Sequence, residues 1–140
     1  MSTPLIETRE LKKYFKTSKG MLHAVDGVNL SISAGSTLGV VGESGCGKST
    51  LGRTILRLIE PTSGEILYNG QNIAAYNTRQ MLSIRKEMQI IFQDPFSSLN
   101  PRMSVRDIIA EPIRVCKLCH SNAEINQRVD RLMDTVGIAS

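Results

Sequence analysis

Eight consecutive residues constrain the fold of this chain more than any other stretch. They fit the pattern G-x-x-x-x-G-K-[ST] in full and run Gly42-Glu43-Ser44-Gly45-Cys46-Gly47-Lys48-Ser49. An apolar run at 37–41 precedes them, which predicts a strand buried on both faces. Aliphatic residues at 51, 55, 58 and 59 follow at the spacing of one buried helix face. Strand, loop and helix in this order are the context that a phosphate-binding loop requires.

The residue types in this loop suit a ligand with several negative charges. Glycines let the backbone curl tightly, so that many N–H groups can point at phosphates, and the following helix adds the positive end of its dipole. Lys48 is predicted to reach the β- and γ-phosphates, and Ser49 to place its hydroxyl on Mg²⁺. The predicted nucleotide-binding residues of the loop and helix start are Gly42, Ser44, Gly45, Cys46, Gly47, Lys48, Ser49 and Thr50.

Composition limits the alternatives. The chain has 140 residues, 41% hydrophobic and 21% charged, which predicts at most one globular domain. Its 17 Lys and Arg residues are interspersed with 13 acidic ones, and aromatics make up only 4%, so no basic and aromatic platform for nucleic acid is expected. The sequence has neither an export signal pattern nor a window of 18 apolar residues. We therefore expect a chain that is neither exported nor membrane-spanning.

Three cysteines are too few for a disulfide framework and fit a reducing compartment. Two of them lie in Cys116-Lys117-Leu118-Cys119-His120, which matches the C-x-x-C-H pattern of covalent haem attachment. Free cysteine also behaves as a small hydrophobic residue, and this stretch follows an apolar helical segment. A helix end is the favoured interpretation, with a haem or transient metal site as the alternative.

Turn and strand patterns predict the first ninety residues to be rich in strands. Residues 5–15 indicate a strand ending in two aromatics, and 21–33 a second strand with one buried face. A proline-containing turn at 61–64 is expected to stop the first helix. Asn69-Gly70 favours positive φ, so residues 65–73 are predicted to form a hairpin.

The last part of the chain is predicted to be mainly helical. A helix is expected at 78–87, followed by a buried strand at 88–92. Capping-box patterns beginning at Ser104 and Ser121 predict two more helices. Pro112 is expected to end or kink the first of these, and Gly137 to end the second.

Taken in order, these features resemble the nucleotide-binding domain of ATP-binding cassette (ABC) transporters over nearly all of residues 5–138. The segment 91–102, Ile-Phe-Gln-Asp-Pro-Phe-Ser-Ser-Leu-Asn-Pro-Arg, is similar to the subgroup that powers oligopeptide and dipeptide importers, with nickel importers close by. The resemblance implies an α/β fold with a partial P-loop NTPase core, an antiparallel β subdomain and the start of an α-helical subdomain. It places the nucleotide-binding core at 1–94 and the incomplete helical subdomain at 95–140.

The resemblance also implies roles for two residues outside the loop. Phe15 matches the aromatic that stacks on adenine, with Tyr14 as the alternative because the register can slip by one residue. Gln93 matches the glutamine that contacts Mg²⁺ and the attacking water, and whose loop relays the nucleotide state to the membrane subunit. Lys48 and Gln93 are thus the expected catalytic residues, and Ser49 and Gln93 the expected metal ligands.

The implied function is that of an ATPase subunit, with ATP and Mg²⁺ as cofactors, coupling hydrolysis to peptide uptake. The implied partners are transmembrane permease subunits, a second ATPase subunit and, indirectly, an extracytoplasmic substrate-binding protein; no nucleic acid is implied. The implied location is peripheral, at the cytoplasmic face of the cell membrane. An ABC ATPase acting on DNA or ribosomes and a c-type haem electron carrier remain alternatives.

Three motifs of the resembled family have no counterpart here: the signature motif, the acidic strand end with its catalytic glutamate, and the switch histidine. In that family they all lie beyond the position of Ser140, and His23 and His120 are in the wrong places for the switch. We therefore expect the N-terminal part of a longer ATPase that binds Mg-ATP weakly and scarcely hydrolyses it, because phosphoryl transfer depends on groups that orient the water. Unpaired sheet edges also predict poor solubility.

Overall fold

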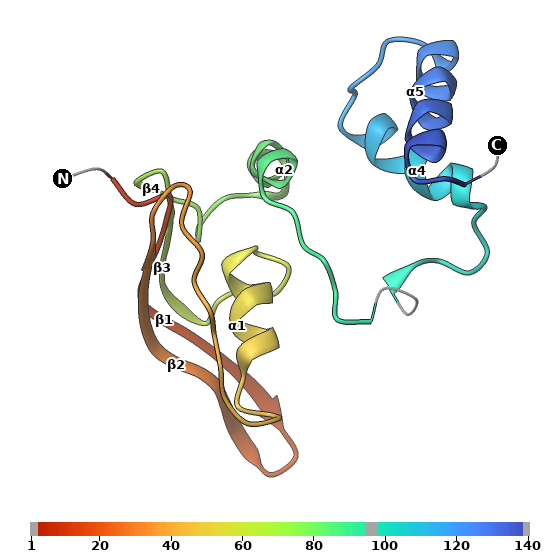
Figure 1. The fold of residues 1–140 in the computed structure, drawn as a ribbon. Coiled ribbons are helices and arrows are strands. Elements are labelled where there is room, and N and C mark those ends of the chain that lie inside the picture. The colour runs from red at the N-terminus through yellow and green to blue at the C-terminus, as the bar shows by residue number, and fades with distance from the viewer. Residues whose placement is uncertain (1–2, 95–97, 139–140) are drawn as a thin grey trace. The chain divides into compact units, whose positions relative to one another are not determined.

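The computed structural model describes residues 3–94 and 98–138 (Figure 1). The chain divides into two compact units, Met1–Met88 and Gln89–Ser140. Within the described residues, the first contains a four-stranded sheet and two helices, and the second contains helices α4 (Val105–Val115) and α5 (Asn122–Thr135). No helix in the described ranges combines the length and apolar character needed to cross a bilayer.

The sheet of the first unit is built on a long hairpin. Strand β1 (Ile6–Thr17) pairs antiparallel with β2 (Gly20–Ile32) on one side and with β3 (Ser63–Tyr68) on the other, and β3 pairs with β4 (Gln71–Asn72). The order is β2-β1-β3-β4. Both long strands match the predicted ranges. In β2, Val28, Leu30 and Ile32 are half-buried and alternate with exposed polar residues, as the pattern predicted.

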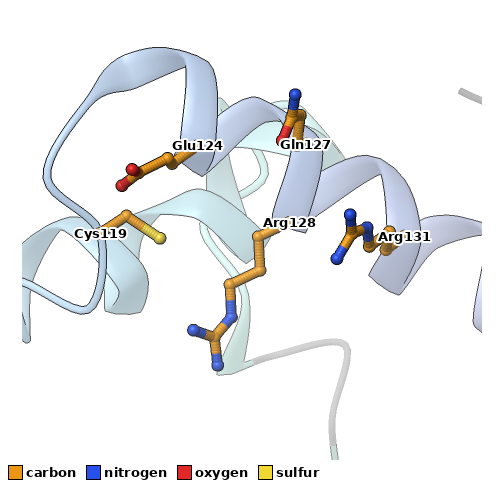
Figure 2. Close-up of a pocket in the computed structure, with 5 residues that line it drawn as sticks. All are labelled: Cys119, Glu124, Gln127, Arg128 and Arg131. Atoms are coloured by element: carbon orange, nitrogen blue, oxygen red, sulfur yellow. The ribbon is translucent and has the colours of Figure 1, made fainter.

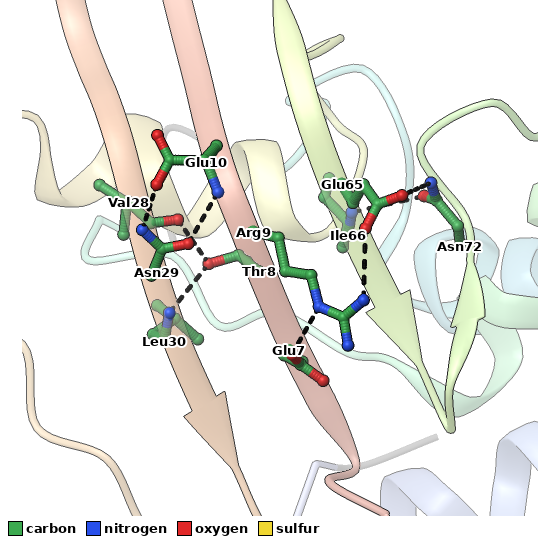
Figure 3. Close-up of polar contacts among 10 residues, drawn as sticks. All are labelled: Glu7, Thr8, Arg9, Glu10, Val28, Asn29, Leu30, Glu65, Ile66 and Asn72. Carbon is green, nitrogen blue, oxygen red and sulfur yellow. Dashed lines mark hydrogen bonds and ion pairs between the residues drawn. The ribbon is translucent and has the colours of Figure 1, made fainter.

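A bulge in β1 bends the hairpin. Glu10 has a left-handed φ of 46°, and the register of β1 shifts there against both neighbouring strands. The hydroxyl of buried Thr8 donates to the Val28 carbonyl at 2.9 Å and accepts from the Leu30 N–H at 3.2 Å. Asn29 bonds both the backbone N–H and the carboxylate of Glu10 (Figure 3). Side chains thus satisfy backbone groups that the bulge removes from the ladder.

The predicted Asn-Gly hairpin is present. Asn69 and Gly70 have φ of 49° and 78° and connect β3 to β4. Two successive positive φ values are the requirement of the type I′ turn, which is why this dipeptide identified the hairpin from sequence.

The core of the first unit lies between the sheet and helices α1 (Lys48–Ile55) and α2 (Thr78–Glu87). Its buried residues are Leu11, Val25, Ile55, Ile66, Ile73 and Met81. Helix α2 has the predicted bounds, and Asn77 and Gln80 form a capping box at its start. Helix α1 ends six residues before the predicted stop at Pro61, because the chain turns at Arg57, whose φ is 53°. Consequently Leu58 is exposed instead of lying on the buried helix face.

Two strand predictions are wrong. Residues 37–41 and 88–92 contain no strand, and Val41 and Ile91 are 93% and 95% exposed. An apolar run is buried in a sheet only when another strand supplies its hydrogen bonds. In the described residues the four strands pair only with one another, so neither run joins the sheet.

In the second unit, α4 (Val105–Val115) and α5 (Asn122–Thr135) bury one apolar cluster. The Ser104 and Ser121 hydroxyls accept from the backbone N–H of Asp107 and Glu124, so both predicted N-caps are confirmed. Pro112 does not end α4, which continues to Val115. Packing of this helix against α5 through buried Ala110 and Ile113 outweighs the loss of one backbone donor.

The end of α5 follows the prediction at Gly137. Gly137 has φ of 73° and donates to the Asp134 carbonyl, while Ile138 donates to the Met133 carbonyl. These are the two bonds of a Schellman motif. The cysteines of the C-x-x-C-H segment agree with the helix-end interpretation: Cys116 is the C-cap of α4, and Cys119 packs against the helical cluster.

Candidate nucleotide-binding loop

Two glycines of the loop at 42–49 have left-handed backbone conformations. Gly45 and Gly47 have φ of 81° and 95°, which side chains rarely allow. A Cβ on Gly47 would also lie only 2.1 Å from the Ala24 carbonyl oxygen on β2. The glycine at 47 is therefore required both by its own conformation and by the close approach of the strand.

The N-terminus of α1 differs from those of the other described helices. Its N-cap is Gly47, and within the described part of the chain no side chain accepts a hydrogen bond from its first turn, which also lacks an acidic residue. In contrast, Asn77, Ser104 and Ser121 cap α2, α4 and α5. The N–H groups at the start of α1 are therefore available to an anion, and the helix dipole favours negative charge there.

Lys48 is held by the loop itself. Its Nζ donates to the carbonyl oxygens of Gly42 and Glu43, both at 2.7 Å, and lies 3.6 Å from the Cys46 Sγ. An ammonium has three donors, and the third is engaged by Cys46 Sγ, a weak acceptor that a phosphate oxygen can replace. This geometry fixes a positive charge beside the free N–H groups of α1.

The other predicted loop residues surround this charge. Ser49 is exposed at the second position of α1, and Thr50 is half-buried at the third. Ser44 is exposed in the turn before Gly45, and Cys46 carries an exposed free thiol. The structure thus brings together the predicted residues between 42 and 50, and Ser49 offers the hydroxyl oxygen that Mg²⁺ prefers.

A cavity of about 340 Å³ adjoins the loop. One wall comes from residues 23–26 and Val28 of β2, and another from Val40 and Val41 of the extended segment. Cys46, Gly47, Lys48 and Leu51 close it on the loop side. Its lining combines apolar side chains with His23, Asp26 and Lys48, which suits a ligand that is part flat and apolar and part anionic.

An aromatic pair stands on the strands beside this cavity. Tyr14 of β1 lies opposite His23 of β2, and the two rings stack with centroids 3.8 Å apart. Asp26 anchors both, accepting a hydrogen bond from the Tyr14 hydroxyl and lying 3.4 Å from His23 Nδ1. The bond from Tyr14 lowers the pKa of the Asp26 carboxyl and raises that of the tyrosine.

His23 and Asp26 were not among the predicted site residues, although both line the cavity next to Lys48. A tight turn at 17–20 fixes the register that places residue 23 opposite residue 14. The register of this hairpin is therefore the sequence feature from which His23 and Asp26 could have been predicted.

The two remaining predicted residues are placed differently. Phe15 is half-buried on β1 next to Tyr14, so the two side chains point to opposite faces of the strand, and Lys13 Nζ lies 4.9 Å from the Phe15 ring centroid. Gln93 is exposed and belongs to the second unit. Its contact with Mg²⁺ stays a prediction.

Relatives and solved structures agree on the kind of protein. The chain is 50% identical over 139 residues to the oligopeptide transport ATP-binding protein OppF of Bacillus subtilis, covering 99% of this chain and 46% of that protein. It is 45% identical to OppF of Lactococcus lactis, covering 96% of this chain and 44% of the relative. The chain therefore spans less than half of the length of these relatives.

Among solved structures, the ATP-binding cassette MJ0796, a dimer bound to ADP and Pi, matches with a TM-score of 0.79 at 23% identity, covering 96% of this chain and 58% of that one. The cbiO1 protein of Clostridium perfringens, part of the cbiONQ transporter complex, matches with a TM-score of 0.67 at 29% identity, over 98% of this chain and 52% of that one. The fold is thus the partial P-loop α/β fold of these cassettes. The family described as ABC transporter matches residues 25–140, and the chain belongs to that family.

Proposed function

We propose that this chain is the ATP-binding portion of a subunit that couples ATP hydrolysis to peptide import. The observation that carries the nucleotide part is the junction of a fixed Lys48 ammonium with the uncapped N-terminus of α1. The peptide part rests on the oligopeptide transport names of relatives that are 45–50% identical. Permease subunits, a second ATPase subunit and an indirectly coupled binding protein are the proposed partners, at the cytoplasmic membrane face.

Within this proposal, the residues of the loop bind and orient the triphosphate. The free N–H groups of α1 and the third Lys48 donor hold the β- and γ-phosphates, and Ser49 supplies a hydroxyl ligand to Mg²⁺. Bound Mg²⁺ neutralises charge on the phosphate oxygens. Gln93 is proposed to orient the attacking water and to complete the metal site.

The geometry supports Tyr14 over Phe15 as the aromatic beside adenine. Tyr14 shares a face with His23, which lines the cavity next to Lys48, whereas Phe15 points to the opposite face of β1. Stacking holds a base without reading it in detail, because it needs only a flat ring. Asp26 keeps this pair in place through its bonds to both rings.

Nucleotide binding is tested by titrating the 140-residue chain with Mg-ATP in a calorimeter. Lys48→Ala should weaken binding by roughly tenfold or more, because a charge-assisted bond to phosphate is lost. Lys86→Ala is the matched control, since Lys86 is an exposed lysine on α2 of the same unit, and it should leave affinity unchanged. If the two substitutions change the affinity for Mg-ATP equally, the loop at 42–49 is not the nucleotide-binding site.

Turnover and transport are tested separately. We propose that the 140-residue chain binds Mg-ATP but hydrolyses it scarcely, so phosphate release should stay near background. Steady turnover that Lys48→Ala abolishes would contradict this. In cells, Lys48→Ala in the complete reading frame should stop growth that depends on peptide uptake, while uptake of free amino acids continues.

A further inference from the structure

A second cavity, of about 320 Å³, lies on the helical unit, apart from the loop at 42–49. Figure 2 shows its lining: Glu124, Gln127, Arg128 and Arg131 from α5, with Cys119 from the segment before that helix. The four α5 residues are spaced i, i+3, i+4 and i+7, which places them along one face of the helix. These four polar residues form a stripe along α5, and Cys119 lies at the N-terminal end of this stripe.

The charges along this stripe are separated. Glu124 lies at the end nearest Cys119, and Arg131 lies at the other end (Figure 2). The two residues are seven positions apart on the helix, which is about 10 Å along its axis. Arg128 lies between and adds a second guanidinium. The stripe thus presents one negative pole and one broader positive pole.

The positive pole is not neutralised within the described part of the chain. The nearby acidic residue Asp130 pairs instead with Arg106 at 2.7 Å, and neither Arg128 nor Arg131 forms an ion pair with a described carboxylate. Each guanidinium has a fork of donors that matches a carboxylate. Gln127 also lines the cavity.

The negative pole is fixed but not used up. The Glu124 Oε2 accepts a hydrogen bond from the His120 backbone N–H at 2.7 Å, which ties the carboxylate to the start of α5. A carboxylate offers about four acceptor positions, so several stay open to a donor. Its charge would repel a polyanion such as a nucleotide, and it favours a ligand that brings an ammonium group to this end.

We propose that this stripe binds the zwitterion of a short peptide, with the terminal carboxylate on Arg128 and Arg131 and the terminal ammonium on Glu124. Three residues in extended form span at most about 10–11 Å, comparable to the spacing of positions 124 and 131 along the helix axis. The site lies in a different unit from Lys48, so it does not rest on nucleotide binding.

The test is a titration of the ¹⁵N-labelled 140-residue chain with trialanine, followed by amide chemical shifts. Shifts should concentrate on residues 119–131. N-acetyl-trialanine, which lacks the ammonium, and trialanine amide, which lacks the carboxylate, should each bind at least about tenfold more weakly, because each loses one charge-assisted contact. Inorganic phosphate and acetate serve as plain anion probes.

Two substitutions assign the poles. Arg131→Gln should weaken trialanine binding by roughly tenfold and leave the affinity for the amidated peptide unchanged. Glu124→Gln, which keeps an acceptor for the His120 N–H, should do the same with respect to the acetylated peptide. Arg102→Gln is the matched control, an exposed arginine of the same unit outside the cavity, and should change nothing.

Three results would overturn the proposal. One is the absence of saturable shifts at millimolar trialanine. Another is equal binding of the free and capped peptides. The third is displacement of trialanine by phosphate or acetate at equal concentration, which would reduce the cavity to a general anion surface. Lys48→Ala should leave trialanine binding unaltered. Failure of the nucleotide proposal and failure of the peptide proposal can then be told apart.

Discussion

Three glycines near the phosphate-binding loop offer a test in which one substitution should have three different effects. Gly45 has φ of 81° with nothing near its missing Cβ, Gly47 has φ of 95° with the Ala24 carbonyl 2.1 Å from that position, and Gly52 lies inside α1 in open space. Alanine should therefore add backbone strain alone at position 45, strain with a steric clash at position 47, and neither at position 52.

The magnitudes follow from these environments. A left-handed alanine costs about 1–2 kcal/mol, so Gly45→Ala should destabilise by that amount. Gly47→Ala adds a backbone clash, and overpacking costs about 1–3 kcal/mol, for a loss of about 2–5 kcal/mol in all. Gly52→Ala should stabilise by about 0.5–1 kcal/mol, because glycine is unfavourable in a helix interior. Against a total stability of about 5–15 kcal/mol, the Gly47 effect is severe.

Urea denaturation of the 140-residue chain, followed by circular dichroism, measures the free energy of unfolding for each variant. Mg-ATP titration of the same three proteins reports the loop, and affinity should fall for Gly45→Ala, fall further for Gly47→Ala and stay unchanged for Gly52→Ala. If Gly47→Ala behaves like Gly52→Ala in both assays, the close packing of the loop against β2 is not as described, and the reasoning fails.

Other features give shorter predictions. Thr8→Val should cost about 1–3 kcal/mol in urea denaturation, because a buried hydroxyl that serves two backbone groups is lost, while Thr8→Ser should retain most of the stability. The pKa of Asp26 is lowered from 3.8 by its bond from Tyr14, so its ionised form stabilises the fold above that pH and this contribution is lost as pH falls through the lower value; Asp26→Asn should flatten the acid limb of the stability profile. Maleimide should alkylate exposed Cys46 more slowly when Mg-ATP is bound, and Lys48→Ala should remove that protection, as mass spectrometry can show.

Features that depend on a few neighbouring residues could be predicted from the sequence. The Asn69-Gly70 turn, the bounds of α2 and the termination of α5 at Gly137 are each set by local φ preferences or caps. The same holds for the loop at 42–49, whose glycines, lysine and helix start are contiguous. Its predicted residues accordingly meet in one place.

Features that depend on residues distant in the sequence could not be predicted from the sequence. The runs at 37–41 and 88–92 have strand-like composition, but a strand exists only beside another strand, and none pairs with them in the described residues. Pro112 was expected to end or kink a helix; the helix does not end there, because packing of α4 on α5 stabilises it beyond the proline. His23 and Asp26 join the site only through the register of a hairpin.

The two carbonyl bonds to Lys48 have a consequence for how a nucleotide arrives. A free lysine side chain samples many rotamers, and fixing it costs up to about 2 kcal/mol of conformational entropy. Here the Gly42 and Glu43 oxygens already hold the ammonium at 2.7 Å, so that ordering happens when the chain folds. Nucleotide association should then proceed with little rearrangement of this side chain, and its affinity should be less sensitive to temperature-driven disorder of the loop.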